Sequence, residues 1–289
     1  MKKSIVFLLV AALLGGSVYS QGFYFRAGGT YGLPVGTSVL GDKSNFTYDY
    51  STDVSTATGS SKAVSGSFGA GPTFSIAVGY KFNQNFMFDL SGEYLVSNKY
   101  QISSYSKYIY SGYSAVDSDF TNSQAKAFLI NPSFVFSAGF GKAAPYGRFG
   151  IVVGIPQMTV NESYYNNGDG VTQYDKTWVY KKGLAFGYQA AIGMNWKLSD
   201  KFDIYTEVNI LNMTWYAQQS ELTKDIENGT NVLPNMSVSQ IQTKYEKSFD
   251  PTVQQDPTQP SVQLREASPF SSVSVNVGLR YTLFQKKDQ

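Results

Sequence analysis

Residues 273–284, VSVNVGLRYTLF, alternate between two unlike faces. One face carries the large apolar side chains of Val273, Val275, Val277, Leu279, Tyr281 and Leu283. The other face carries Ser274, Asn276, Gly278, Arg280 and Thr282. A period of two predicts a β-strand whose faces have different surroundings. Alternation alone does not say whether the apolar face contacts a protein core or lipid, so the rest of the chain has to decide.

Seven other segments alternate in the same way: 22–31, 73–82, 86–97, 126–140, 146–158, 183–198 and 202–215. Pro132 interrupts the segment 126–140, because a strand interior disfavours proline. With 273–284 the chain is expected to have eight strands. Ten strands are the alternative, since residues 232–249 could add a hairpin.

The connections between these segments are alternately short and long. The short ones, 83–85, 141–144 and 199–201, have the length of hairpin turns. The long ones are about 32–72, 98–125, 159–182 and 216–269, and they are rich in Ser, Thr, Gly, Pro and Gln. Such composition is typical of solvated loops. Residues 100–113, which hold five tyrosines, could instead extend the two neighbouring strands beyond the rim. The pattern predicts an all-β, antiparallel, up-and-down sheet with the tight turns at one end and four long loops at the other.

The first twenty residues have the features of a secretory signal peptide. Lys2 and Lys3 precede an apolar run, and small residues lead to Ser20. The run is too short for the roughly 20 residues of a spanning helix. Residues 21–289 are then expected to form one domain with 21 basic and 21 acidic residues. This balance gives no support to a nucleic-acid partner.

Volume and side-chain size place the apolar faces outward. Eight strands with about five large apolar side chains each would have to bury about forty of them, but an eight-stranded barrel has an interior only just wide enough for side chains to fill. A soluble two-sheet sandwich could hold them. The opposite faces favour a barrel interior, because they carry many small residues with isolated charges. Aromatic residues near the short turns suit a membrane interface, namely Phe82, Phe86, Phe149, Trp196, Phe202, Tyr281 and Phe284. We therefore expect a transmembrane antiparallel β-barrel.

The charges on the small-residue faces predict an ion-pair network inside this barrel. Its expected members are Arg26, Lys81, Asp89, Glu93, Arg148, Lys197, Asp203, Glu207 and Arg280. Charges in a membrane barrel must pair or be hydrated. Across the tight turns we expect Lys81 to pair with Asp89 and Lys197 with Asp203. Glu207 is expected to reach Arg280. Such a network would plug the half of the interior near the short turns.

The chain resembles the small eight-stranded outer-membrane barrels of Gram-negative bacteria, the OmpA/OmpX-like, porin-family β-barrel proteins. The resemblance is sharpest where Asn276, Gly278, Tyr281 and Leu283 match the family's C-terminal assembly signal. It implies insertion into the cell outer membrane by the assembly machinery, with both termini in the periplasm. Residues 285–289 follow the signal, whereas many members end on the aromatic residue. A mature start at Gln21 resembles exported proteins of the Bacteroidetes group.

Enzymatic chemistry is not expected. The outer-membrane barrel enzymes, as families, depend on a histidine, whose pKa lies near operating pH, and this sequence has none. The carboxylate pairs Asp89/Glu93 and Asp203/Glu207 lie about 13 Å apart along a strand, too far for direct cooperation. Residues 166–170, NNGDG, lack a complete calcium ligand set and are more typical of a turn. We expect no catalytic, cofactor or metal site.

Function is therefore expected in the long loops, because a rigid scaffold usually carries its binding residues there. Their Tyr, Ser, Asn and Gly residues suit adaptable recognition surfaces. The first hypothesis is a non-enzymatic structural or surface-binding protein whose partners are outer-membrane lipid and an unidentified extracellular or envelope ligand. The alternative is a narrow channel for small solutes or apolar ligands.

Overall fold

The computed structural model describes residues 22–138, 142–168, 170–252 and 254–283. The expected signal peptide, residues 1–20, lies outside these ranges. The described chain is all-β, as predicted, and its strands belong to one sixteen-stranded sheet. The expectation of eight strands, or ten, is therefore wrong, because the long connections also form strands.

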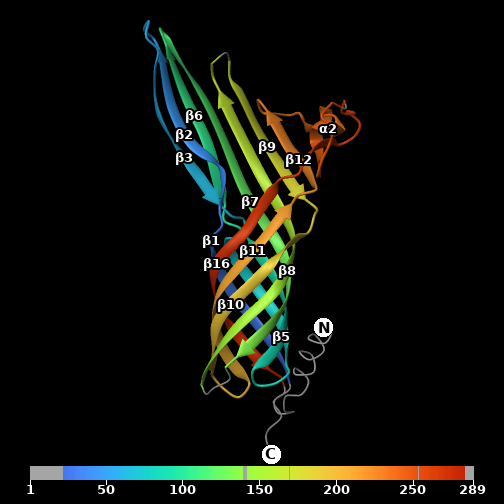
Figure 1. Ribbon diagram of the computed structural model, residues 1–289. Helices are drawn as coiled ribbons and strands as arrows, with labels where there is room; N and C mark the ends of the chain where they lie inside the picture. The colour runs from blue at the N-terminus through green and yellow to red at the C-terminus, as the bar shows by residue number, and fades with distance from the viewer. Residues whose placement is uncertain (1–21, 139–141, 169, 253, 284–289) are drawn as a thin grey trace, which may run out of the picture.

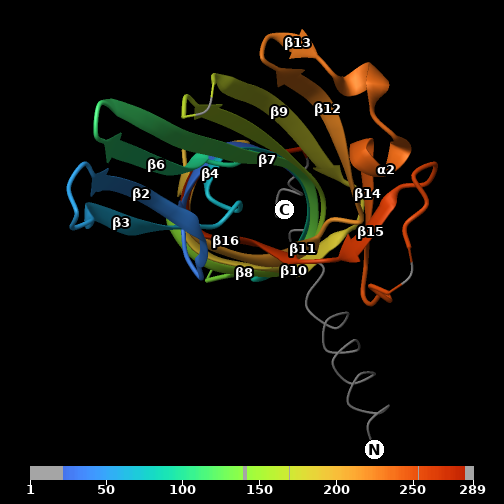
Figure 2. The same ribbon diagram turned by 90° about the horizontal axis from the view of Figure 1, so that it is seen from above.

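Eight strands pair in a closed antiparallel cycle, termed the strand ring here (Figure 2). They contain most or all of each of the eight segments predicted from alternation. Residues 139, 140 and 284 of those segments lie outside the described ranges. In order of pairing they are β1 (Gly22–Pro34), β4 (Gly71–Lys81), β5 (Phe86–Val96), β7 (Tyr113–Ser137), β8 (Ala143–Asn166), β10 (Ala185–Lys197), β11 (Phe202–Tyr216) and β16 (Ala267–Thr282). β16 returns to pair with β1, where Gly28 lies opposite Gly278.

The remaining strands extend the sheet beyond one end of the strand ring (Figure 1). They are β2 (Ser38–Tyr50), β3 (Thr56–Gly66), β6 (Tyr100–Tyr110), β9 (Thr172–Lys181), β12 (Gln219–Glu227), β13 (Thr230–Asn231), β14 (Gln242–Glu246) and β15 (Ser261–Leu264). β7 and β8 continue from the ring into this part, termed the sheet extension. Two of its pairs, β2–β6 and β14–β15, are parallel.

The segment 232–249 does not form the extra hairpin considered from the sequence. It holds the short helices η1 (Leu233–Asn235) and α2 (Val238–Ile241) and the strand β14. No helix among the described residues has the length and apolar character needed to cross a membrane.

The two faces of the ring strands have opposite exposures. In β1 the side chains of Phe23 and Phe25 are exposed, whereas Tyr24 and Arg26 are buried. The same alternation follows the other ring strands, so that most large apolar side chains point outward, whereas the inward faces carry polar and small residues together with some large apolar ones. Ile192 on β10 is 72% exposed and Val275 on β16 is 60% exposed. The question raised by residues 273–284 thus has a structural answer: their apolar face lies on the outside of the ring.

Small residues on the inward faces leave room for the large side chains that also point into the ring. Gly28 on β1 and Gly278 on β16 flank the ring of Tyr205 from β11, and a Cβ atom on Gly28 would lie 2.1 Å from the Tyr205 hydroxyl. Pro132 is accommodated in β7 because pairing with β8 stops after Ile130 and resumes at Ser133 without a change in register.

Candidate functional site

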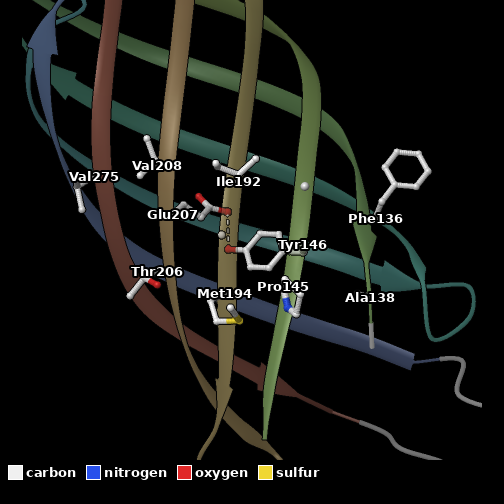
Figure 3. Close-up of a pocket in the computed structure, with 12 residues that line it drawn as sticks. Phe136, Ala138, Pro145, Tyr146, Ile192, Met194, Thr206, Glu207, Val208 and Val275 are labelled. Atoms are coloured by element: carbon white, nitrogen blue, oxygen red, sulfur yellow. Dashed lines mark hydrogen bonds between the residues drawn. The ribbon is translucent and has the colours of Figure 1, made fainter. Parts of the chain in front are cut away.

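A buried ion network occupies the middle of the strand ring. Arg26 from β1 lies 3.1 Å from Glu207 on β11 and 3.4 Å from Asp89 on β5. Arg148 from β8 lies 3.0 Å from the second oxygen of Glu207. Tyr146 donates a hydrogen bond to Glu207 at 2.8 Å, and Figure 3 shows these two side chains pointing toward each other. Burying a charge is costly unless it is paired and hydrogen-bonded. The partners in this network come from different strands, so the charges are paired only when these strands close into the ring.

The remaining predicted network residues lie on two levels. Arg280 and Asp203 form an ion pair of 2.6 Å near the short turns, directly opposite each other in the β11–β16 register. Lys197 instead contacts Asp200 at 3.0 Å. Glu93 points inward on β5, nearer the sheet extension, and accepts hydrogen bonds from Ser91 and Gln189.

The three ion pairs expected from the sequence differ from the pairs that the structure contains. Asp89 bonds to Arg26 and Tyr24 rather than to Lys81, because Asp89 lies opposite Gly79 and Lys81 is two residues further toward the turn. Lys197 does lie opposite Asp203, but Asp203 bonds to Arg280. Glu207 lies opposite Asn276, four residues from Arg280.

Apolar clusters fill the interior on both sides of the ion network. Toward the short turns, Tyr24, Met87, Val135 and Tyr146 pack together. Toward the sheet extension a larger cluster includes Leu95, Leu129, Val152, Leu211, Met213, Trp215 and Phe270. Apolar clusters thus flank the ion network on both sides, and the Arg280–Asp203 ion pair lies beside the smaller cluster, where Arg280 contacts the face of the Tyr24 ring.

The segment between β3 and β4 covers the end of the ring that meets the sheet extension. Phe68 is buried against Phe270 and Tyr100, with ring centroids 5.9 Å and 5.6 Å away. Its backbone N–H donates to Pro269 at 2.9 Å. The hydroxyl of Ser67 accepts from the N–H of Ser271 at 2.6 Å. Residues 67–70 therefore form a cap over the interior. Alternation could not reveal this cap, because it is not a strand.

The outer surface of the ring has shallow apolar recesses. One of about 660 Å³ lies around Gly147 and Gly193, where side chains such as Phe136, Ile192 and Val275 surround the gap (Figure 3). Within the described ranges, no group of three His, Cys, Asp or Glu residues is arranged to hold a metal ion. The lining of the recess is mainly apolar.

The sheet extension carries rows of stacked tyrosines. Tyr48 on β2 stacks on Tyr108 of β6 at 5.3 Å, and Tyr110 stacks on Tyr113 across the β6–β7 turn at 4.7 Å. On the other side, Tyr164 and Tyr174 stack at 5.0 Å between β8 and β9. Cross-strand aromatic pairs stabilise a sheet, and exposed ones present rigid amphipathic contact area. The segments expected as flexible loops are therefore ordered strands over much of their length.

The residues of the expected C-terminal signal all have contacts in the ring. Asn276 donates to Glu207 at 3.1 Å, and Gly278 makes room for the Tyr205 ring. Tyr281 packs on Phe202 at 4.8 Å, and the N–H of Leu283 donates to Phe23 at 2.9 Å. The ring itself thus provides reasons for these residue types at the closing strand.

No family model matches the chain, and no curated protein matches its sequence.

Proposed function

We propose that this protein is an integral outer-membrane protein in which the strand ring is a transmembrane β-barrel and the sheet extension is a non-enzymatic surface for binding. The observation that carries the proposal is the inverted distribution of side chains: the ring exposes most of its large apolar residues and buries most of its charges. A water-soluble protein rarely exposes a contiguous apolar surface of this kind. In lipid the same surface is favourable, and a closed cycle satisfies the backbone hydrogen bonds of every spanning strand.

The position of the sheet extension supports a role outside the membrane. The described chain enters β1 and leaves β16 at the end of the ring that also carries the short turns. The longer connections all extend from the opposite end (Figure 1). In the proposed orientation the short turns and both termini face the periplasm. The stacked tyrosines then face the exterior, on a sheet held by the barrel rather than on mobile loops.

The channel hypothesis is less well supported. A channel needs a continuous polar path, but the interior contains apolar clusters on both sides of the ion network. The cap formed by residues 67–70 also covers one end. Planar-bilayer recordings test this alternative: large, steady conductance from the folded protein would favour the channel over the closed barrel.

Membrane topology is tested by combining gel migration with surface proteolysis. A barrel that stays folded in detergent should migrate differently before and after boiling. On intact cells, protease should cleave only in the sheet extension, for example near 51–55 or 228–229, and leave a protected ring. Cleavage in the short turns of intact cells, or release of the protein by washing without detergent, would contradict the proposal.

The binding role needs its own experiment, because a structural barrel would pass the topology test. Replacing Tyr48, Tyr108 and Tyr110 with Ser removes the stacked row on β2 and β6 while the ring is untouched. The proposal expects loss of cell-surface or envelope-component binding with unchanged gel migration. Ser substitutions at the exposed positions Thr56 and Thr58 of β3 serve as the matched control.

A further inference from the structure

Glu93 is a buried carboxylate without an ion pair. Its side chain points into the strand ring, and the residue is 7% exposed. It accepts hydrogen bonds from Ser91 Oγ at 3.2 Å and from Gln189 Nε2 at 3.4 Å, both neutral groups. Among the described residues, no Lys or Arg nitrogen lies within ion-pair distance of Glu93. A buried carboxylate normally needs a positive partner.

The arginines of the same region are already committed to other carboxylates. Arg26 contacts Asp89 and Glu207, and Arg148 contacts Glu207. Arg280 pairs with Asp203 near the short turns. Lys81 lies opposite Met87, six residues along β5 from Glu93, which corresponds to about 20 Å. The middle of the interior therefore holds one more negative than positive charge.

A small cavity of mixed lining lies beside Glu93. Its volume is about 10 Å³, and its lining combines the apolar side chains of Leu95, Leu129 and Leu211 with polar residues that include Glu93, Thr30, Thr73, Asn209 and Ser272. This is about the space of one water-sized sphere. The Oδ1 atom of Asn209 is buried and has no hydrogen-bond partner. An amide oxygen without a donor, a carboxylate without a cation and several hydroxyl groups thus surround a space of atomic size.

We propose that this cavity binds one small monovalent cation of the Na⁺ class. The Glu93 carboxylate and Asn209 Oδ1 would be its principal ligands, and the hydroxyls of Thr30, Thr73 and Ser272 would complete an all-oxygen shell. Hard cations prefer such oxygen ligands. One carboxylate matches a single positive charge, whereas divalent sites usually recruit more than one. The cation supplies the charge that the ion network lacks at this level.

The test measures thermal unfolding of the folded protein in non-ionic detergent. NaCl is varied against N-methylglucamine chloride at constant ionic strength and at neutral pH. Wild-type protein should gain about 2–3 °C in its unfolding midpoint for each tenfold rise in Na⁺ above its Kd. Glu93→Gln should remove this dependence, whereas Glu221→Gln in the sheet extension should retain it.

Two results would overturn the site. If the unfolding midpoint of the wild type did not depend on Na⁺, the cavity would not bind this cation. Stabilisation of the wild type by acid without Na⁺, lost in Glu93→Gln, would show that Glu93 is protonated instead. If Glu93→Gln does not fold, wild-type crystals soaked in a thallium(I) salt still decide the question. An anomalous peak between Glu93 and Asn209 is expected, and its absence would exclude the cation. Membrane location does not affect any of these results.

Discussion

Gly28 and Gly29 are neighbours in β1, but a methyl group has different consequences at the two positions. Gly28 points inward, where a Cβ would lie 2.1 Å from Tyr205, and Gly29 points outward with nothing within 4 Å. Overpacking in a closed interior typically costs about 1–3 kcal/mol. We therefore expect Gly28→Ala to lower the free energy of unfolding by about this amount and Gly29→Ala to leave it nearly unchanged. Urea unfolding of the two variants in detergent measures the difference. Equal effects would contradict the assigned inward and outward faces.

Glu207 joins the two arginines of the ion network, and its side chain is 0% exposed. Glu207→Gln leaves Arg148 buried without an ion partner. Breaking a buried pair in this way typically costs about 3–5 kcal/mol. The control is Lys197→Gln, because Lys197 is 45% exposed and its partner Asp200 is 86% exposed. An exposed pair is worth under about 1 kcal/mol. If both variants unfold at the same urea concentration, the network does not stabilise the ring.

At the residue scale, the sequence predicted which side chains point inward but not which of them pair. The inward charges follow from alternation alone. Their partners depend on curvature and on both neighbouring strands, as Asp203 shows. It lies between Lys197 and Arg280 in the sheet and bonds to Arg280. Asn209 and Gln189 were not singled out, because neutral amides inside a strand give no pattern of their own.

At the element scale, the part of the β7–β8 pair that lies in the sheet extension, termed the β7–β8 stem here, contains two carboxylates whose pKa values are raised. Burial raises the pKa of Asp119 on β7, and the nearby charge of Asp117 raises it further. Burial also raises the pKa of Glu162 on β8, with a contribution from Asp119. A folded-state pKa above the unfolded value means that the folded form binds protons more tightly. Its stability then rises as pH falls through the folded pKa values.

The β7–β8 stem should therefore become more protected in mildly acidic solution. Hydrogen exchange, corrected for intrinsic rates, is expected to show slower opening of residues 117–122 and 161–165 near pH 4 than near pH 7. Asp119→Asn should weaken this dependence. Asp250→Asn is the control, since the Asp250 pKa is lowered by hydrogen bonds from Thr252 in an exposed turn. Faster opening of the wild-type stem in acid would contradict the assigned direction.

The strand β3 shows why part of the sheet extension could not be predicted from the sequence. β3, TATGSSKAVSG, is exposed along most of its length, and neither face is apolar. Period-two alternation arises only where the two faces have different surroundings, so a strand solvated on both faces leaves no such signal. The ring strands were found because their outward residues are large and apolar. β7 and β8 were found only in the parts that belong to the ring.

At the scale of the whole molecule, one substitution separates a membrane protein from a soluble one. Ile192 lies on the outside of the ring, within β10, and is 72% exposed. On a water-exposed surface Ile192→Lys would be neutral within about 0.5 kcal/mol and would improve solubility. On the lipid face near the bilayer midplane, a lysine costs about 2–4 kcal/mol. The proposed orientation thus predicts that Ile192→Lys clearly lowers stability, whereas the same change on a water-exposed surface would have little effect.

The experiment compares folding into phospholipid vesicles for the wild type, Ile192→Lys and Ser60→Lys. Ser60 is exposed on β3 in the sheet extension, outside the proposed membrane, so its replacement should have little effect. Ile192→Lys should fold less efficiently and unfold at lower urea concentration in vesicles. If it instead matches Ser60→Lys and yields a folded protein that is soluble without detergent, the apolar outside of the ring does not face lipid. Another protein would then have to cover the apolar outside of the ring, because large apolar side chains exposed to water are unfavourable.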